Sequence, residues 1–260
     1  MSNLIYKILI LLPLCITFLL GEEVAVITKN NGNIKYKKFS ANLFKNKVNP
    51  GMELFNQDLL STGNDGFVMF AFLDDGSLIK VHKNSRVFVN GEVKNNTINK
   101  DIIIEDGFIK FNINKQNQKE FKVVTPTSVA SVKGTVFYLD SKKNRDVFYG
   151  LEGIVEVLNI ESNDISNLTT NKKITSTPDG VLTIEDIKLE DIQYIQQIQK
   201  ESGLETDEIE DTDFYDDGSG DNNNSDDDIG SDESSVQEIV INFTNESGEQ
   251  KKLIIKYINE

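Results

Sequence analysis

Length, composition and charge set the first limits on this chain of 260 residues. It has 38% hydrophobic residues, no Trp and a formal net charge of −15. This acidity excludes the basic footprint of a nucleic-acid-binding protein, and a single His and a single Cys exclude zinc sites of the usual composition. The charge is uneven, because 14 of the 42 acidic residues lie between Glu205 and Glu233, a stretch without Lys or Arg.

The first 21 residues are typical of an export signal. Lys7 precedes an apolar run, Ile8–Leu20, which as a helix would span ~20 Å, short of the ~30 Å hydrocarbon core of a bilayer. This length favours a cleaved signal peptide over residues 1–21, ending at the small residue Gly21. We therefore expect an exported protein in the periplasm or at the cell surface. Acylation of Cys15 and an uncleaved membrane anchor stay open as alternatives.

Residues 22–182 predict an all-β domain. Short apolar stretches rich in Val, Ile and Phe alternate with Gly-containing turn pairs, and no long helical pattern separates them. The expected strands are 67–73, 77–81, 86–89, 102–104, 108–113, 121–124, 136–139 and 154–158, and the expected reversals or corners include Asn64–Gly66, Asp74–Gly76, Asn90–Gly91, Asp106–Gly107 and Glu152–Gly153. The spacing of the apolar stretches does not distinguish a β-sandwich from a β-barrel or a β-solenoid. The stretch 67–73 is apolar at both parities, which predicts cover on both faces, whereas 108–113 alternates and predicts a half-exposed strand.

The rest of the chain predicts three appendages. Residues 183–203 carry Ile184, Ile187, Ile192, Ile195 and Ile198 at helical spacing, with Thr183 as capping residue, and indicate one amphipathic helix. Residues 204–235 are rich in Asp, Asn, Ser and Gly, a composition typical of a disordered acidic linker. Residues 236–260 hold two β-prone runs around a polar turn and predict a terminal β-hairpin.

Several short elements between about Asn49 and Leu158 occur in the order found in one known family. The residues are Gly51, Leu54, Asp58, Thr62–Gly63, Asp75–Gly76–Ser77, Asp106–Gly107, Phe111, Phe121, Val123, Thr125–Pro126, Val132–Lys133–Gly134–Thr135, Phe137, Glu152–Gly153, Val155 and Val157. Together they resemble the FecR domain, named for a regulator of iron-dicitrate uptake. Gln57 stands where that family usually has glycine. The motif residues themselves are of types that form turns, so we interpret them mainly as folding constraints.

The resemblance implies an all-β, β-solenoid-like or sandwich-like FecR domain on the far side of the cytoplasmic membrane. The best-known members relay transporter occupancy to a sigma factor through a cytoplasmic segment ahead of one membrane span. Here only six residues precede Lys7. We therefore expect a stand-alone exported member that lacks the cytoplasmic anti-sigma segment.

No catalytic or cofactor-binding residue is assigned. His82 is the only histidine, and the only cysteine lies in the leader. A Ser-His-Asp triad would therefore have to use His82, and the mature chain would have no cysteine for a Cys-His pair. We expect His82 at a surface or at a strand edge. Paired carboxylates of the glycosidase kind are the remaining route to an enzyme, which we do not favour. The acidic tract offers oxygen ligands for calcium, although its spacing does not match an EF-hand loop. The candidate ligands are Asp211, Asp213, Asp216, Asp217, Asp221, Asp226, Asp227 and Asp228.

The sequence therefore predicts an exported, non-catalytic binding or scaffold module of the bacterial cell envelope. Its expected partner is an envelope protein or a cell-wall polymer, not a nucleic acid, with membrane association only through the leader. Two alternatives stay open. One is a signalling component that acts through a membrane partner, and the other is a calcium-responsive surface protein that uses the acidic tract.

Overall fold

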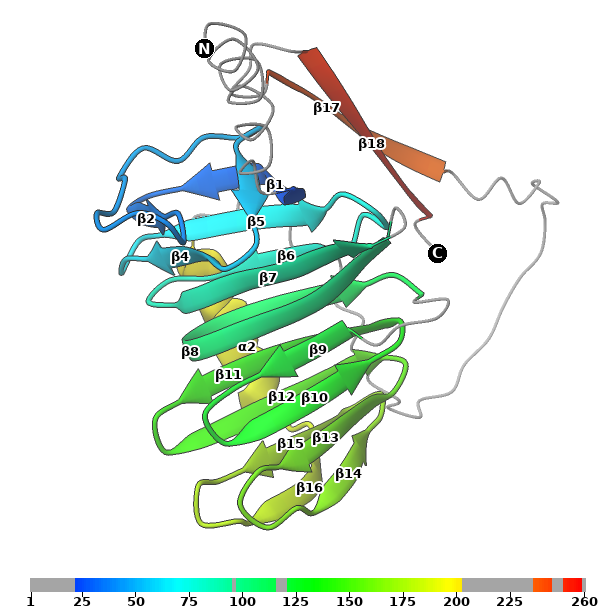
Figure 1. The fold of residues 1–260 in the computed structure, drawn as a ribbon. Coiled ribbons are helices and arrows are strands. Elements are labelled where there is room, and N and C mark those ends of the chain that lie inside the picture. The colour runs from blue at the N-terminus through cyan, green and yellow to red at the C-terminus, as the bar shows by residue number, and fades with distance from the viewer. Residues whose placement is uncertain (1–21, 95–96, 116–120, 203–235, 245–249, 259–260) are drawn as a thin grey trace, which may run out of the picture.

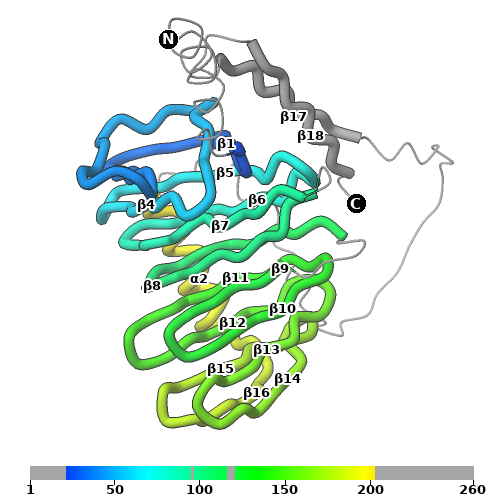
Figure 2. Tube along the Cα trace, in the orientation of Figure 1, coloured from blue at the N-terminus to red at the C-terminus, as the bar shows by residue number. Residues whose placement is uncertain are grey.

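A computed structural model describes residues 22–94, 97–115, 121–202, 236–244 and 250–258. The predicted signal peptide and the acidic linker lie outside these residues. The main body is a stack of β-strands along which the chain advances from one end to the other, as the colours show (Figures 1 and 2). The prediction of an all-β fold with one helix near the C-terminus is confirmed.

The strands form two layers that share one long strand, β8. Sheet A contains, in order, β3 (Glu53–Phe55), β1 (Glu23–Asn31), β5 (Phe67–Phe72), β6 (Leu78–Val81), β8 (Thr97–Ile113), β11 (Thr135–Lys142), β12 (Arg145–Glu152), β15 (Lys172–Ser176) and β16 (Leu182–Asp186). Sheet B contains β2 (Ile34–Lys37), β4 (Asp58–Thr62), β7 (Arg86–Lys94), the first half of β8, β9 (Phe121–Val124), β10 (Ser128–Val132), β13 (Val155–Asn159) and β14 (Ile165–Leu168). Neighbours pair antiparallel except β8 and β9, which pair in parallel.

The two glycine pairs nearest β8 behave differently from simple turns. Asp106–Gly107 forms a corner inside β8, where the strand leaves sheet B and enters sheet A. Gly107 has φ +133, and an added Cβ would lie 2.2 Å from Ser85 Oγ, so the corner requires glycine. The sequence predicts a reversal or corner at Asn90–Gly91, and this prediction is wrong. Gly91 is paired within β7, where a Cβ would lie 2.7 Å from Val24 Cγ1.

The core lies between the two sheets and is built from their inward-facing side chains. Phe72 and Phe111 of sheet A contact Phe121 of sheet B with ring centroids 5.6 and 6.3 Å apart. Residues of both parities are buried along β5, which confirms the expected cover on both faces. The prediction that strand 108–113 exposes its polar side chains is wrong at Lys110. This residue is only 7% exposed, and its ammonium lies 5.4 Å from the Tyr138 ring centroid.

Helix α2 (Leu189–Glu201) covers the outer face of sheet A, behind the strands in Figure 1. Ile195 and Ile198 are buried in a second apolar cluster with Phe108 and Tyr138 of the sheet. The helix begins six residues later than the periodicity predicts, because Leu182–Asp186 pairs with β15 as strand β16. The N-terminal capping carboxylate is accordingly Asp191 and not a residue near Thr183.

The C-terminal segment forms a separate two-stranded sheet. β17 (Val236–Thr244) pairs antiparallel with β18 (Gln250–Ile258). A hairpin therefore occurs where the two β-prone runs predict one.

Candidate functional site

The aspartate of the first family motif is committed to internal bonds. Asp58 is 0% exposed, and it accepts hydrogen bonds from Tyr36 Oη at 2.6 Å and from the backbone N–H groups of Phe55 and Phe39 at 2.9 and 3.0 Å. Burial raises the pKa of Asp58, while these donors act against that rise. Gln57, which replaces the usual glycine, keeps a left-handed φ of +66. Asp58 therefore fixes a loop and is not presented to a ligand.

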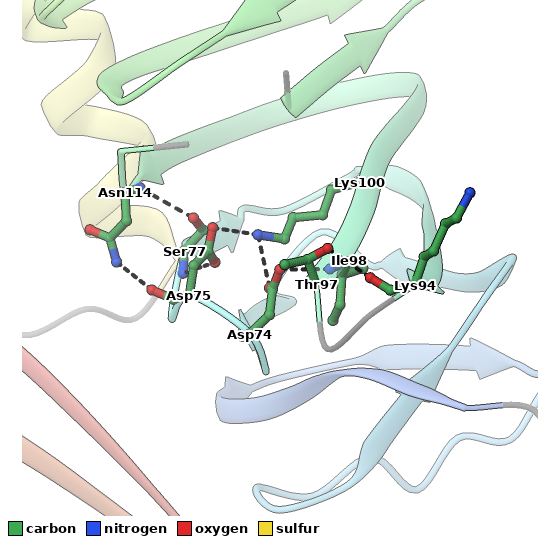
Figure 3. A network of polar contacts seen from close by, with 8 residues as sticks. All are labelled: Asp74, Asp75, Ser77, Lys94, Thr97, Ile98, Lys100 and Asn114. Atoms are coloured by element: carbon green, nitrogen blue, oxygen red, sulfur yellow. Dashed lines mark hydrogen bonds and ion pairs between the residues drawn. The ribbon is translucent and has the colours of Figure 1, made fainter. Parts of the chain in front are cut away.

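The Asp75–Gly76–Ser77 motif is likewise a structural junction (Figure 3). Asp75 Oδ1 accepts the Ser77 N–H at 2.9 Å. The ammonium of Lys100, which is 1% exposed, forms ion pairs with Asp75 and with Asp74, the latter at 2.8 Å. These bonds hold the β5–β6 turn against the start of β8. The charge of Lys100 is neutralised inside the protein.

A third buried carboxylate organises the segment around Thr125–Pro126. Asp146 is 0% exposed and accepts hydrogen bonds from four hydroxyl groups. Thr125, Thr127 and Ser128 donate to Oδ2, and Ser141 donates to Oδ1 at 2.7 Å. The motif residues of this segment thus serve the fold, as the sequence interpretation holds.

His82 is fully buried, which contradicts the expected surface or edge position. Its ring lies 5.5 Å from both the Phe67 and Phe108 rings, because the end of helix α2 covers this part of sheet A. Ser202 Oγ donates to the Ile198 carbonyl, so the Nδ1–H of His82 donates to Ser202 Oγ at 2.9 Å. Burial lowers the pKa of His82 to about 3. A neutral ring without access to solvent cannot act as a general base for a substrate.

One open hollow of about 280 Å³ lies beside helix α2, lined by Lys83, Asn84, Asp106, Gly107, Phe108, Asp140, Ser141, Lys142, Lys143, Tyr194 and Ile198. Inside it, Asp140 accepts bonds from Lys142 at 3.0 Å and from Tyr194 at 3.1 Å. Burial acts to lower the pKa of Lys142, but the bonds to Tyr194 and Asp140 outweigh it and raise that pKa. Burial also raises the pKa of Tyr194. Near neutral pH the hollow holds a charged amine and a protonated phenol, neither of which is a nucleophile.

The outer face of sheet B carries an apolar row that crosses six strands. Its members are direct cross-strand neighbours, and each points away from the core. The row is Phe88, Ile103, Val124, Val129, Leu158 and Ile165. At strand spacings of about 4.8 Å, it is about 24 Å long. Ile103 is 37% and Ile165 is 60% exposed.

A polar row runs beside the apolar row on the same face, and its members are also in register. It comprises Asn90, Asp101, Lys122, Ser131, Glu156 and Asn167. An apolar strip bordered by polar groups is the usual arrangement of a protein-binding surface. Helix α2 covers the outer face of sheet A, whereas no helix of the described residues crosses the apolar row on the outer face of sheet B (Figure 1).

The predicted calcium ligands, Asp211 to Asp228, lie outside the described residues, so calcium binding stays a prediction. In the described ranges, no three His, Cys, Asp or Glu side chains gather as a metal site. No helix in that part of the chain has the length and hydropathy of a transmembrane segment. The apolar row escaped the sequence analysis because single residues such as Phe88 and Ile103 align only once the strand register is known.

The fold and surface define an all-β, two-layer domain whose ionisable motif residues are used internally. Residues 58–156 match the family model described as FecR protein. The resemblance to the FecR domain that is stated from the sequence is therefore confirmed over these residues.

Solved structures give a weaker likeness. Two crystal structures of a protein from Parabacteroides distasonis ATCC 8503, provisionally named an anti-sigma factor, are 18% identical to this chain with a TM-score of 0.45. The match covers 54% of this chain and 64% of that one. No curated protein matches the chain.

Proposed function

We propose that this protein is a non-catalytic binding module of the cell envelope, which receives a partner protein on the outer face of sheet B. The observation that carries the proposal is the apolar row from Phe88 to Ile165. A row of this length on an open sheet face offers an apolar strip to a partner, whereas the hollow beside Asp140 offers no activated group. The proposal includes export of the chain, for which the leader sequence is the support.

The partner that fits best is an amphipathic helix. Helix α2 already shows this mode of binding within the chain, since it lays Ile195 and Ile198 across the strands of sheet A. The row on sheet B is about 24 Å long, the length of a helix of about 16 residues. Lys122 and Glu156 of the bordering row would pair with charges along one edge of such a helix.

Photo-crosslinking in the native host tests the proposal. A benzoylphenylalanine placed at Ile103 should form one major adduct with an envelope protein, and the linked peptide should show helical apolar periodicity. The matched control is the same group at Asn84, an exposed residue of the β6–β7 turn on the side of helix α2. Equal adducts at both positions, or none at Ile103 at native expression, would remove the support for a binding face on sheet B.

A second candidate, favoured by the FecR domain itself, is a signalling component that passes envelope status to a membrane partner. It requires a transcriptional change when the gene is deleted. An unchanged transcriptome under envelope stress and iron limitation would eliminate this candidate and leave the scaffold role.

A further inference from the structure

The segment between β2 and β3 contains a small closed loop with an unusual surface. Residues 37–44 are closed by two backbone hydrogen bonds, from the Tyr36 N–H to the Lys45 carbonyl at 2.9 Å and from the Lys45 N–H to the Tyr36 carbonyl at 2.7 Å. The Phe39 N–H donates to the buried Asp58 carboxylate at 3.0 Å. The loop is therefore anchored to the core at its base, and its tip is held in place.

Large apolar side chains point outward from this loop. Phe39 is 68% exposed, Leu43 is 80% exposed and Phe44 is 40% exposed. Such exposure has an energetic penalty in water, since full burial of a side chain of this size stabilises it by about 1.5–3 kcal/mol. Three of them on one loop of eight residues indicate a surface that becomes buried when the protein binds something.

The charge of the segment is opposite to that of the chain. Residues 32–52 contain five lysines and no Asp or Glu, although the chain as a whole carries −15. The lysines are Lys35, Lys37, Lys38, Lys45 and Lys47. Lys37 lies 5.7 Å from the Phe44 ring centroid and Lys38 lies 4.0 Å from that of Phe55. The Lys37 ammonium therefore lies beside the exposed Phe44 ring, and the other lysines flank the apolar tip in sequence.

We propose that this loop, residues 37–44, inserts into the surface of an anionic phospholipid bilayer, with Lys35, Lys45 and Lys47 beside it. Exposed Phe and Leu side chains among lysines are the combination that enters the boundary between headgroups and acyl chains. Each lysine near an anionic surface adds electrostatic attraction, which falls off within a Debye length. The positive loop is thus complementary to an anionic leaflet, whereas the rest of this acidic chain is repelled by it.

This contact is separate from the partner surface proposed on sheet B. The apolar row runs across the strands, whereas the loop projects from the β2 end of the stack. It also adds a membrane contact to a chain for which the sequence predicts membrane association only through its leader. The folded domain itself would lie against the bilayer at this loop.

The chain has no Trp, which allows a local test with the full-length protein. Leu43→Trp places a single fluorophore at the tip of the loop. Ile154→Trp is the matched control, because Ile154 is also exposed, at 60%, and lies in the β12–β13 turn. Each variant is titrated with vesicles of phosphatidylcholine alone and of phosphatidylcholine with 30% phosphatidylglycerol (about 0.1 M salt), with and without brominated acyl chains. A signal from Leu43→Trp reports insertion of the loop itself, whatever the leader does.

We expect a blue shift and bromine quenching of Leu43→Trp in the anionic vesicles, little change in the neutral ones, and no change for Ile154→Trp. Adding Lys45→Gln and Lys47→Gln should weaken the lipid titration about 25-fold, at about fivefold for each lysine. The pair Lys143→Gln and Lys188→Gln, exposed residues of the β11–β12 turn and of the start of helix α2, should leave it unchanged. An unshifted Leu43→Trp, equal signals from the two tryptophans, or equal binding to neutral vesicles would each overturn the proposal.

Discussion

Replacement of Asp146 by Ala tests whether the buried polar cluster is a folding element. Asp146 is 0% exposed and lies on β12, where its two oxygens accept bonds from Thr125, Thr127, Ser128 and Ser141. The substitution removes the common acceptor and leaves four hydroxyl groups inside the protein. It introduces no bulk, so any loss of stability reflects the missing bonds and the small cavity.

The expected loss follows from the bonds that cannot be replaced. A hydrogen bond to a charged group contributes about 1.5–3 kcal/mol, and a buried hydroxyl left without an acceptor has a penalty of about 1–3 kcal/mol. Thr125 Oγ1 can still donate to the Ser128 carbonyl at 3.2 Å, and the hydroxyls of Thr127 and Ser128 lie 3.3 Å apart. The Ser141 hydroxyl donates to Asp146 and loses this acceptor. We therefore expect Asp146→Ala to lower the free energy of unfolding by about 3–5 kcal/mol, a large part of the ~5–15 kcal/mol of a typical domain.

Urea denaturation followed by far-ultraviolet circular dichroism measures this change. Asp179→Ala is the control, because Asp179 is exposed and accepts a bond from the Thr177 hydroxyl; it should change the free energy of unfolding by less than about 0.5 kcal/mol. A loss below about 1 kcal/mol for Asp146→Ala would refute the view that the cluster holds the fold. A loss of similar size for both variants would refute it as well.

Three further predictions use the same denaturation assay. Burial lowers the pKa of His82 to about 3, so between pH 6.5 and pH 3 the unfolded chain binds a proton that the folded chain does not. Between pH 7 and pH 5, the free energy of unfolding of the wild type should therefore fall by about 2 kcal/mol more than that of His82→Gln. Ile195→Ala removes a side chain that is 1% exposed and should lower the free energy of unfolding by about 2–4 kcal/mol, whereas Leu189→Ala, at a residue 70% exposed, should have little effect. Lys100→Ala leaves Asp74 and its neighbour without their cation and should lower the free energy by about 2–3 kcal/mol, since the carboxylates are partly exposed.

Each of these has a contradicting result. Parallel pH profiles for wild type and His82→Gln would show that His82 is protonated as readily in the folded chain as in the unfolded one. Equal effects of the substitutions at 195 and 189 would show that helix α2 is not docked through its buried face. An unchanged Lys100→Ala protein would show that the ion pairs on β5 and β8 contribute nothing.

The strands were the most predictable part of the fold, because their apolar stretches and turn residues lie in local sequence. The strand 121–124 is predicted with the bounds that the structure gives. The strands 102–104 and 108–113 are predicted apart but belong to one strand, β8. Local signals cannot distinguish a turn from a corner, since Asp106–Gly107 suits both. The two-layer arrangement of sheets A and B depends on which strands pair, and pairing is a long-range property.

The positions of the ionisable groups were the least predictable part. A histidine at a strand end is usually near the surface, but helix α2 returns along sheet A and buries His82 under residues some 120 positions later in the chain. The apolar row has the same origin, because Phe88 and Val124 become neighbours of Ile103 only through the register of three strands. In contrast, the structural role of the motif residues followed from their turn-forming types, and Asp58 and Asp75 bear it out.

The most direct test of the central proposal combines photo-crosslinking with a change of charge on sheet B. Benzoylphenylalanine is placed at Val124, and the adduct with the envelope partner is compared between the unmodified row and a Phe88→Glu, Ile103→Glu variant of the same protein. Both substituted side chains point away from the core, so the fold should persist, which circular dichroism checks. A binding face on sheet B predicts that the adduct falls at least tenfold, and an unchanged adduct yield in the folded variant would contradict it.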